Sequence, residues 1–413
     1  MSTILIIGAG HAGTQFAASL RKHGYKGKVK LASSEADLPY HKPPLSKAYL
    51  SSREELLQPL RSRSFFESQG IELMLGRKAS KIVRDEKLVI FEDGQTVAYD
   101  QLVLATGTVP VSLACPGCDL DAVFCLRTAD DARSIRRHLQ SPANIVVVGG
   151  GFIGLESAAM LAKVGHNVTV LELSDTILTR VCSPEIAAEI SSEIVDLGVD
   201  LRCGVSVDSI EGDSVSVQSV ATSDGNISRA ELVIIGIGAK PPMELAETAG
   251  LDVSNGIKVD SYMQSSHRDI FAIGDCANFP QVHIGQRARL ESVQNAIDQA
   301  DHLAQLITGK TKQPYSQLPW FWSDIGNIKL QIAGLTHCAD KKLAVNRNGQ
   351  LSAVYHYKGE ELVCVETINS GGEHMLARQM ISANYSPSPD LTNLSDLSRL
   401  KEAFLTWKTA KLA

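Results

Sequence analysis

ILIIGAGHAG, residues 4–13, and IVVVGGGFIG, residues 145–154, are two copies of one pattern, and they decide the fold. In each copy an aliphatic run leads into G-x-G-x-x-G, and small apolar residues at helical spacing follow. The first glycine permits a tight turn, the second lets a pyrophosphate approach the backbone, and the third lets helix and strand pack closely. The helix N-terminus then faces the phosphates. Two copies predict two bound dinucleotides, held by Gly8, Gly10 and Gly13 and by Gly149, Gly151 and Gly154.

Acidic residues follow both copies. The second copy continues into the strand VTVLE, which ends at Glu172, where a carboxylate can accept hydrogen bonds from both hydroxyls of an adenine ribose. Glu35 is the less secure counterpart in the first copy, because an insertion around Gly27 moves it beyond the equivalent strand end, and Ser34 is an alternative for part of the role. For both carboxylates the other interpretation is a solvated strand end.

Composition is typical of a large globular enzyme. A chain of 413 residues predicts two or three domains, and its apolar fraction of 44% and charged fraction of 21% are ordinary. A formal net charge of −6, without any Lys/Arg block, argues against nucleic acid as a main partner. The chain enters a strand by Ile4, which leaves no room for a signal peptide, and no apolar run approaches the roughly 20 residues that span a bilayer. We expect a cytoplasmic protein.

The eight cysteines are expected to be reduced thiols. Cys115 and Cys118 form CPGC, a spacing that can be redox-active. They follow a Pro-rich connection with no helix start to lower a thiol pKa, and two cysteines alone make a zinc site unfavourable. We therefore predict no metal site and no redox role for this pair.

The order of strand and helix signals predicts three structural regions. Alternation through residue 170 is typical of parallel α/β architecture, and short strands with turn signals follow between about 200 and 235. LVIIGIGAKP (232–241) and IFAIGDCA (270–277) predict further buried strands. After a polar, Pro-rich boundary at 309–319, the runs KLQIAGL, LSAVYHY and LVCVETI, a helix at about 373–383 and a basic helical tail predict a separate α+β domain.

Eight motifs together resemble one family over essentially the whole chain: the FAD-dependent, NADH-oxidising ferredoxin reductases of bacterial oxygenase systems, which include putidaredoxin reductase and aromatic-dioxygenase reductases. The motifs are GAGHAG, LPYHKPPLSK (38–47), LATGTVP (104–110), LRT (126–128), GGGFIGLE, IFAIGDCA, RLESVQNAIDQA (289–300) and PWFWSD (319–324). The resemblance implies an α/β, glutathione reductase-like fold with two Rossmann-type domains and a C-terminal α+β domain. It implies an FAD-binding domain of residues 1–111 and 240–315, an NAD-binding domain of residues 112–239, and a C-terminal domain of residues 316–413.

The resemblance also implies which residues hold which cofactor. FAD would occupy the first glycine turn, with Lys42 and Lys47 beside its diphosphate and ring, Asp275 at its ribityl hydroxyls and Trp322 as an aromatic wall. The implied FAD contacts are Gly8, Gly10, His11, Ala12, Gly13, Ser34, Glu35, Lys42, Pro43, Lys47, Ala79, Ala105, Thr106, Gly107, Arg127, Gly274, Asp275, Glu291, Ser292, Val293 and Trp322. The implied NADH contacts are Gly149, Gly151, Phe152, Ile153, Gly154, Glu156, Glu172, Gly236 and Gly238. A turn aspartate and core tryptophans are the alternatives for Asp275, Trp322 and Trp320.

The function that the resemblance implies is NADH:ferredoxin oxidoreduction. NADH would give hydride to FAD, and electrons would pass singly to a [2Fe–2S] ferredoxin that feeds a cytochrome P450 or a Rieske-type oxygenase. We expect Lys47 and Glu156 to form an ion pair beside the flavin and act catalytically, with Glu156 in the first helical turn after the second glycine motif. We expect NADH rather than NADPH as the donor, because Glu172 would repel a 2′-phosphate.

Two other functions remain open from the sequence. A disulfide or peroxide reductase would need a cysteine in or soon after the first helix, and this chain has none before Cys115. A flavin-bearing signalling protein, such as relatives of apoptosis-inducing factor, is disfavoured by the ordinary length and the lack of a targeting segment.

A ferredoxin partner of acidic character is expected to dock transiently over the flavin edge, between the FAD and C-terminal domains of a monomer or weak dimer. Local basic residues would steer it, although a solvated helix face is the alternative. These residues are Lys310, Lys312, Arg399, Lys401, Lys408 and Lys411. The chain departs from the family at Lys42, where Arg is frequent, at Ile325, where Gln is common, and at Pro242, where Asn is usual, which puts flavin tuning and partner choice in question.

Overall fold

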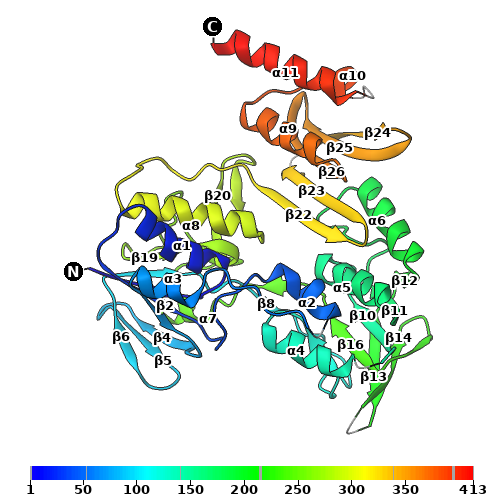
Figure 1. The fold of residues 1–413 in the computed structure, drawn as a ribbon, viewed down its shortest axis with the longest axis horizontal. Coiled ribbons are helices and arrows are strands. Elements are labelled where there is room, and N and C mark those ends of the chain that lie inside the picture. The colour runs from blue at the N-terminus through cyan, green and yellow to red at the C-terminus, as the bar shows by residue number, and fades with distance from the viewer. Residues whose placement is uncertain are drawn as a thin grey trace.

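The computed structural model describes residues 2–412 apart from 53, 140, 214–215, 338 and 393–395, and the chain forms three lobes (Figure 1). In each lobe a sheet is covered by helices. The segments that make one lobe are not all contiguous in the sequence.

The first lobe is built on a five-stranded parallel sheet in the order β19-β7-β1-β2-β3. Its strands are β1 (Thr3–Ile7), β2 (Lys28–Ala32), β3 (Ile71–Met74), β7 (Gln101–Leu104) and β19 (Ile270–Ala272). Pairing of Ile270 with Leu102 therefore adds a late segment to a sheet that begins at Thr3. The helices α1 (His11–Lys22) and α8 (Val293–Ile307) pack side by side in this lobe (Figure 1).

An antiparallel insertion interrupts the expected alternation of strand and helix. The strands β4 (Ala79–Val83), β5 (Leu88–Phe91) and β6 (Thr96–Ala98) form a separate sheet between β3 and β7. Tight turns at Lys87 and Gly94, with φ of +53° and +79°, leave no length for a crossover helix. The prediction of unbroken α/β alternation through residue 170 is therefore wrong here.

The second lobe repeats the parallel architecture, in the order β12-β11-β10-β16-β9. Its strands are β9 (Val123–Cys125), β10 (Asn144–Val148), β11 (Asn167–Glu172), β12 (Asp200–Cys203) and β16 (Leu232–Ile235), with helices α4 (Ala129–His138), α5 (Phe152–Lys163) and α6 (Pro184–Asp196). The expected short strands are present as β13 (Val207–Gly212), β14 (Val217–Thr222) and β15 (Ile227–Arg229). The two-stranded pair of β8 (Val109–Pro110) and β17 (Ala239–Lys240) lies where the chain passes between the first two lobes.

The third lobe is an antiparallel sheet in the order β22-β23-β26-β25-β24, covered by α9 (Gly371–Ser382). Its strands are β22 (Trp320–Ile325), β23 (Ile328–Gly334), β24 (Lys341–Arg347), β25 (Gln350–Lys358) and β26 (Glu361–Ile368). The three predicted strand runs and the predicted helix are confirmed. The chain ends in α10 (Pro389–Thr392) and α11 (Leu397–Leu412), and α11 lies at the outer end of the lobe (Figure 1).

Short elements complete the fold. They are the turns of 3₁₀ helix η1 (Pro43–Ser46) and η2 (Gly274–Cys276), the helices α2 (Ala48–Ser51), α3 (Arg63–Ser68) and α7 (Glu244–Thr248), and the strands β18 (Ile257–Lys258), β20 (Ala277–Gln281) and β21 (Gln286–Ala288). None of the helices in the described part of the chain is long and apolar enough to cross a membrane.

The second and third lobes share one hydrophobic core. Ile325, Leu330 and Ile332 of the third lobe pack with the strands and helices of the second. The rings of Phe152 and Phe321 meet across the same boundary, with centroids 4.6 Å apart. Burial of such aliphatic and aromatic side chains contributes about 1.5–3 kcal/mol each, so the position of β22 is firmly set.

Candidate cofactor and electron-transfer site

Two glycines in each glycine turn are required by the packing of the chain itself. A Cβ on Gly8, whose φ is +108°, would come within 2.2 Å of the carbonyl oxygen of Ala105, and one on Gly13 within 1.9 Å of the carbonyl oxygen of Gly8. In the second turn a Cβ on Gly149 or Gly154 meets a backbone oxygen at 2.6 or 2.2 Å. These first and third glycines therefore have the turn and packing roles expected from the motif.

The middle glycines have no such explanation. Gly10 has a φ of −73°, which any residue adopts, and a Cβ there would meet no described atom within 4 Å. Gly151 has a φ of −83°, and its nearest neighbour would be the carbonyl oxygen of Gly236 at 3.8 Å. Each residue is the N-cap of a helix, α1 or α5, and a Cβ on either would clash with no described atom at the helix N-terminus. A pyrophosphate group fits this cradle, and an added Cβ would enter the space that it needs.

Cationic side chains gather around the first turn. His11 begins α1, and burial, followed by the nearby charges of His41, Lys42 and Arg127, lowers the pKa of His11 to about 4. The buried His11 Nε2 has no hydrogen-bond partner among the described residues. The Arg127 guanidinium donates from Nε to the carbonyl oxygen of Thr108 at 3.0 Å. The unpaired His11 Nε2, the N-terminus of α1 and the cations of Lys42 and Arg127 together form a suitable site for a diphosphate.

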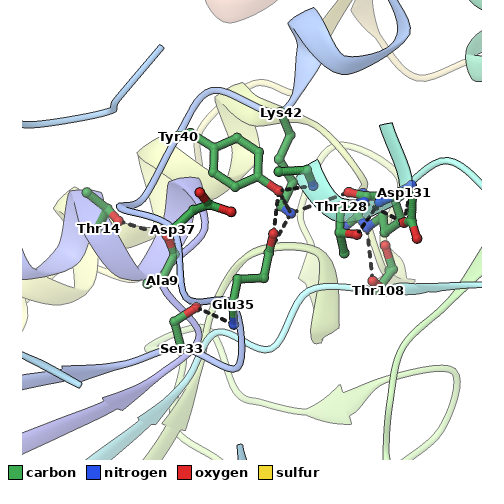
Figure 2. A network of polar contacts seen from close by, with 12 residues as sticks. Ala9, Thr14, Ser33, Glu35, Asp37, Tyr40, Lys42, Thr108, Thr128 and Asp131 are labelled. Atoms are coloured by element: carbon green, nitrogen blue, oxygen red, sulfur yellow. Dashed lines mark hydrogen bonds and ion pairs between the residues drawn. The ribbon is translucent and has the colours of Figure 1, made fainter. Parts of the chain in front are cut away.

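Carboxylates stand beside both turns. Glu172, the last residue of β11, accepts from the backbone N–H of Gly150 at 2.6 Å and from that of Ser174 at 2.8 Å, on different oxygens. Glu35 lies in the loop after β2 and accepts from the Tyr40 hydroxyl and from Lys42 Nζ, the latter at 2.9 Å (Figure 2). The structure thus engages Lys42 with Glu35.

Asp275 lies in η2, directly after Gly274, whose φ is +75°. A Cβ on Gly274 would come within 2.9 Å of that of Ala12, so this turn lies against the start of α1. Burial raises the pKa of the Asp275 carboxyl to about 6, although Arg127 Nη2 at 3.6 Å opposes the rise. Arg127 is the partner of this carboxylate among the described residues, so acceptor sites remain that hydroxyl groups of a ligand would fill.

The side chain of Glu156 joins all three lobes, and we call Ser46, Lys47, Glu156 and Ser323 the Glu156 junction. Lys47 Nζ lies 2.8 Å from Oε1, the Ser46 hydroxyl donates to Oε2 at 2.6 Å, and the Ser323 hydroxyl donates to Oε1 at 2.6 Å. The predicted ion pair of Lys47 and Glu156 is confirmed. Ser46 and Ser323 were missed by sequence reasoning, although each stands inside a quoted motif, PPLSK or WFWSD.

The predicted place of Glu156 in the first helical turn is wrong. The helix α5 starts at Phe152, after the N-cap Gly151, and its first turn carries no acidic residue. Glu156 begins the second turn, where the effect of the helix dipole is weaker. Its carboxylate is instead held by the three donors of the junction.

Aromatic residues of β22 lie between the lobes, because β22 contacts both α5 and α8. The rings of Trp320 and Trp322 are 5.4 Å apart, and the Arg378 guanidinium lies over Trp320 at 4.3 Å. Ile325, at the end of this strand, is fully buried and pairs with Ile328. The departure from glutamine at this position therefore places an apolar residue in the core.

The other predicted residues lie at the ends of the same elements. Ala105, Thr106 and Gly107 directly follow β7, and Gly236 and Gly238 follow β16. The Ser292 hydroxyl caps α8 by accepting from the N–H of Asn295 at 3.0 Å. The remaining placements are Pro43 at the start of η1, Ala79 at the start of β4, Glu291 paired with Arg289 at 2.5 Å, Val293 at the start of α8, and Ser34 and Ile153, which are exposed.

Two predictions concern residues outside this site. The Cys115–Cys118 segment is a turn in which the N–H of Cys118 donates to the carbonyl oxygen of Cys115 at 3.3 Å, and burial raises the pKa of Cys115. A raised pKa disfavours thiolate chemistry. The seven described cysteines are free thiols, and no metal-binding group of His, Cys, Asp and Glu occurs among the described residues.

Comparison with known proteins agrees with this geometry. Residues 2–300 match the family model described as pyridine nucleotide-disulphide oxidoreductase, and residues 320–402 match the model described as reductase C-terminal. The chain belongs to the pyridine nucleotide-disulphide oxidoreductase family. It is a reductase of the ferredoxin reductase type, and its cofactors are FAD and NAD(H).

Among its relatives, the rhodocoxin reductase of Rhodococcus erythropolis is 40% identical over 392 residues, which cover 94% of this chain and 91% of the relative. The rubredoxin-NAD(+) reductase of Pseudomonas putida is 40% identical over 368 residues, 89% of this chain and 95% of the relative. The crystal structure of the ferredoxin reductase for the CYP199A2 system from Rhodopseudomonas palustris superposes with a TM-score of 0.93 at 39% identity and covers 98% of this chain and all of that one. The putidaredoxin reductase of a covalent complex with putidaredoxin gives 0.93 at 37% identity, over 98% of this chain and 99% of that one.

Proposed function

We propose that this protein transfers electrons from NADH through FAD to a [2Fe–2S] ferredoxin, which supplies a cytochrome P450 or a Rieske-type oxygenase. The observation that carries the proposal is the Glu156 junction. One carboxylate on the second dinucleotide helix bonds directly to the first lobe and to β22 of the third. The junction brings together the helix after the second glycine turn, the PPLSK segment of the first lobe and the tryptophan strand, and the two cofactors would meet beside it.

The first lobe would hold FAD and the second NADH. Gly10 and the N-terminus of α1, with His11 and Arg127, would bind the FAD diphosphate, and Asp275 the ribityl hydroxyls. Lys42 would contribute its charge rather than a hydrogen bond, because its Nζ is engaged with Glu35. Gly151 and Glu172 would take the pyrophosphate and adenine ribose of NADH. We assign residues 1–111 and 240–315 to FAD, 112–239 to NADH and 316–413 to the third domain.

FAD, when bound, supplies the hydride and single-electron chemistry. The chain positions the reactants around it. Lys47 presents a cation held by Glu156 at 2.8 Å, and Glu156, only 8% exposed, keeps that charge neutralised in a site largely closed to water. Glu172 selects NADH, because a 2′-phosphate would meet a carboxylate whose two oxygens already hold backbone donors.

A rubredoxin is the second candidate acceptor. The 40% identity to a rubredoxin-NAD(+) reductase equals that to rhodocoxin reductase, so overall similarity does not separate the two. We favour the ferredoxin because the structure for the CYP199A2 system is that of a ferredoxin reductase and that of putidaredoxin reductase holds putidaredoxin, and each covers 98% of this chain.

The test is a steady-state assay of cytochrome c reduction by the holoprotein and NADH, with a [2Fe–2S] ferredoxin, a rubredoxin or neither added. We expect turnover that depends on the ferredoxin and exceeds that with rubredoxin. A higher rate with rubredoxin would favour the second candidate. Reduction of a disulfide or of peroxide by NADH, without transfer to either iron protein, would contradict both.

We further propose that the ferredoxin docks near Trp320 and Trp322, between the FAD domain and the third domain, and that the protein acts in the cytoplasm, where free thiols persist. Of the predicted basic residues, Lys310 and Lys312 belong to the loop between α8 and β22. The tail residues Arg399 to Lys411 lie on α11, at the outer end of the third lobe and away from α8 (Figure 1). The loop pair is therefore better placed than the tail.

A further inference from the structure

The carboxylates of Glu172 and Glu35, beside the two glycine turns, accept the same number of hydrogen bonds. On Glu172 each oxygen accepts one hydrogen bond from a backbone N–H. On Glu35 each oxygen also accepts one, but the donors are the side chains of Tyr40 and Lys42. An ionised carboxylate has about four acceptor sites, so one remains on each oxygen in both cases. Two free sites match the two hydroxyls of a ribose.

The difference arises from the position of Glu35. Glu172 ends its strand and lies against Gly150, whereas Glu35 stands in a loop three residues beyond Ala32, the end of β2. Side chains replace the backbone donors there. Tyr40 is 4% exposed and Lys42 is partly buried, so both are packed in place rather than free in solvent.

The proton of the Tyr40 hydroxyl has one direction available. Its oxygen accepts from the N–H of Ala129 at 2.9 Å and from Lys42 Nζ at 3.2 Å, so the hydroxyl donates to Glu35 (Figure 2). Burial, followed by the hydrogen bond to Glu35, raises the pKa of Tyr40 well above its usual range, and the hydroxyl stays protonated.

The Ala129 donor belongs to the other lobe. Ala129 is the first residue of α4, and the side chains of Thr128 and Asp131 form a capping box that fixes this helix start. The N–H of Thr128 donates to Asp131 Oδ2 at 2.7 Å (Figure 2). The helix N-terminus of the NAD-binding domain thereby orients a hydroxyl that acts on the FAD-binding domain.

We propose that Tyr40 is a positioning residue for the adenosine end of FAD: held by the N-terminus of α4, it presents Glu35 to the ribose hydroxyls. The proposal rests on the assignment of FAD to the first glycine turn. FAD affinity would then depend on a helix of the NAD-binding domain. Neither nucleotide-binding unit considered alone predicts this dependence.

The test uses the full chain freed of flavin and titrated with FAD and with FMN, which lacks the adenosine half. Tyr40→Phe removes only the hydroxyl, and loss of a hydrogen bond to a charged group should weaken FAD binding about tenfold and leave FMN binding unchanged. Tyr49→Phe is the matched control, because Tyr49 is also buried, at 5% exposure, but meets the Arg136 guanidinium through its ring at 4.4 Å. It should bind both flavins as the unaltered chain does.

A double-mutant cycle shows whether Tyr40 acts through Glu35. In a Glu35→Ala background, Tyr40→Phe should cause no further loss of FAD affinity. The proposal would be overturned if the losses of FAD affinity multiplied in the double variant. It would also be overturned if Tyr40→Phe weakened FAD and FMN binding equally, or left FAD affinity unchanged. If the unaltered chain bound no FAD, the proposed function itself would fail, so the two failures are distinguishable.

The role of α4 has its own readout. FAD should protect the amides of residues 129–138 from hydrogen exchange in the unaltered chain, and this protection should be lost in Tyr40→Phe. Equal protection in both proteins would show that Tyr40 does not connect the two lobes.

Discussion

The proposed chemistry depends most strongly on the side chain of Glu156. Its carboxylate neutralises Lys47 at 2.8 Å and is itself held by two serine hydroxyls from different lobes. Removal of one member of such a buried pair leaves an uncompensated charge, which costs about 3–5 kcal/mol where it is fully buried and less at Lys47, which remains 19% exposed.

We predict that Glu156→Ala slows flavin reduction by NADH at least about tenfold. The measurement is stopped-flow reduction of the holoprotein, with flavin content determined for each variant. Ser323→Ala, which removes one donor and leaves the ion pair, should slow it less. An unchanged rate in Glu156→Ala would show that the pair is only structural.

Glu172 should decide between the two nicotinamide donors. A 2′-phosphate placed beside this carboxylate meets like charge at a site where both oxygens are already fixed, a cost that can reach several kcal/mol. We predict that kcat/KM for NADH exceeds that for NADPH at least about a hundredfold. Glu172→Gln should lower this ratio. Comparable kcat/KM values in the unaltered protein would rule out this role.

Asp275 should make FAD binding depend on pH. Its pKa of about 6 means that it takes up a proton between pH 7 and 5, a range in which His11, with a pKa of about 4, stays neutral. Ribityl hydroxyls bind the ionised form better, so FAD affinity should fall roughly tenfold from pH 7 to pH 5. In the flavin-free chain the sign is opposite: the raised pKa stabilises the fold at low pH, and that stability is lost as pH rises from about 4 through 6.

Fluorescence titration with FAD across this pH range provides the measurement. Asp275→Asn should give a flat profile. A profile equally steep in this variant would assign the dependence to another group.

At the scale of elements, the glycines of one turn have two different roles: some allow the chain to pack, and one allows a ligand to approach. Gly13 is pressed against the carbonyl oxygen of Gly8, while Gly10, three residues earlier, faces open space. We predict that Gly13→Ala destabilises the fold by a few kcal/mol, as expected for overpacking. Gly10→Ala should cost the flavin-free chain no more than about 1 kcal/mol, because alanine is a poorer N-cap than glycine, and should weaken FAD binding. Paired melting curves and FAD titrations test both, and a loss of stability in Gly10→Ala as large as that in Gly13→Ala would contradict the assignment.

The same elements show what could be predicted from the sequence. The two strand–turn–helix units, the buried strands and the α+β region were predictable because their signals are local. The hairpin of β4 and β5 was missed, since the turn at Lys87 uses a non-glycine residue with a φ of +53° and gives no sequence signal. The turn between β5 and β6 does carry one, Asp93-Gly94, but a single hairpin signal does not show that two antiparallel turns replace a crossover helix. Ser46 and Ser323 could not be predicted as partners of Glu156, because their contact exists only once three lobes are assembled.

At the scale of the whole molecule, the shared core of the second and third lobes fixes β22 against the two cofactor domains. In the proposed function, Trp320 and Trp322 would lie where an electron leaves, and positive charge on the neighbouring loop should steer an acidic partner. We predict that Lys310→Gln with Lys312→Gln slows ferredoxin reduction severalfold at low ionic strength, with the difference vanishing at high salt. Lys408→Gln with Lys411→Gln, on the distant α11, is the matched control and should have little effect. A larger effect of the α11 substitutions than of the loop substitutions on the rate of ferredoxin reduction would place the docking site at the tail.

The most direct test of the account is anaerobic and pre-steady-state. Holoprotein reduced by one equivalent of NADH is mixed with excess oxidised [2Fe–2S] ferredoxin, and the reduced iron–sulfur centre is counted. Because NADH delivers two electrons and the ferredoxin accepts one, we expect about two reduced ferredoxins for each NADH. Full flavin reduction without any reduced ferredoxin would contradict it.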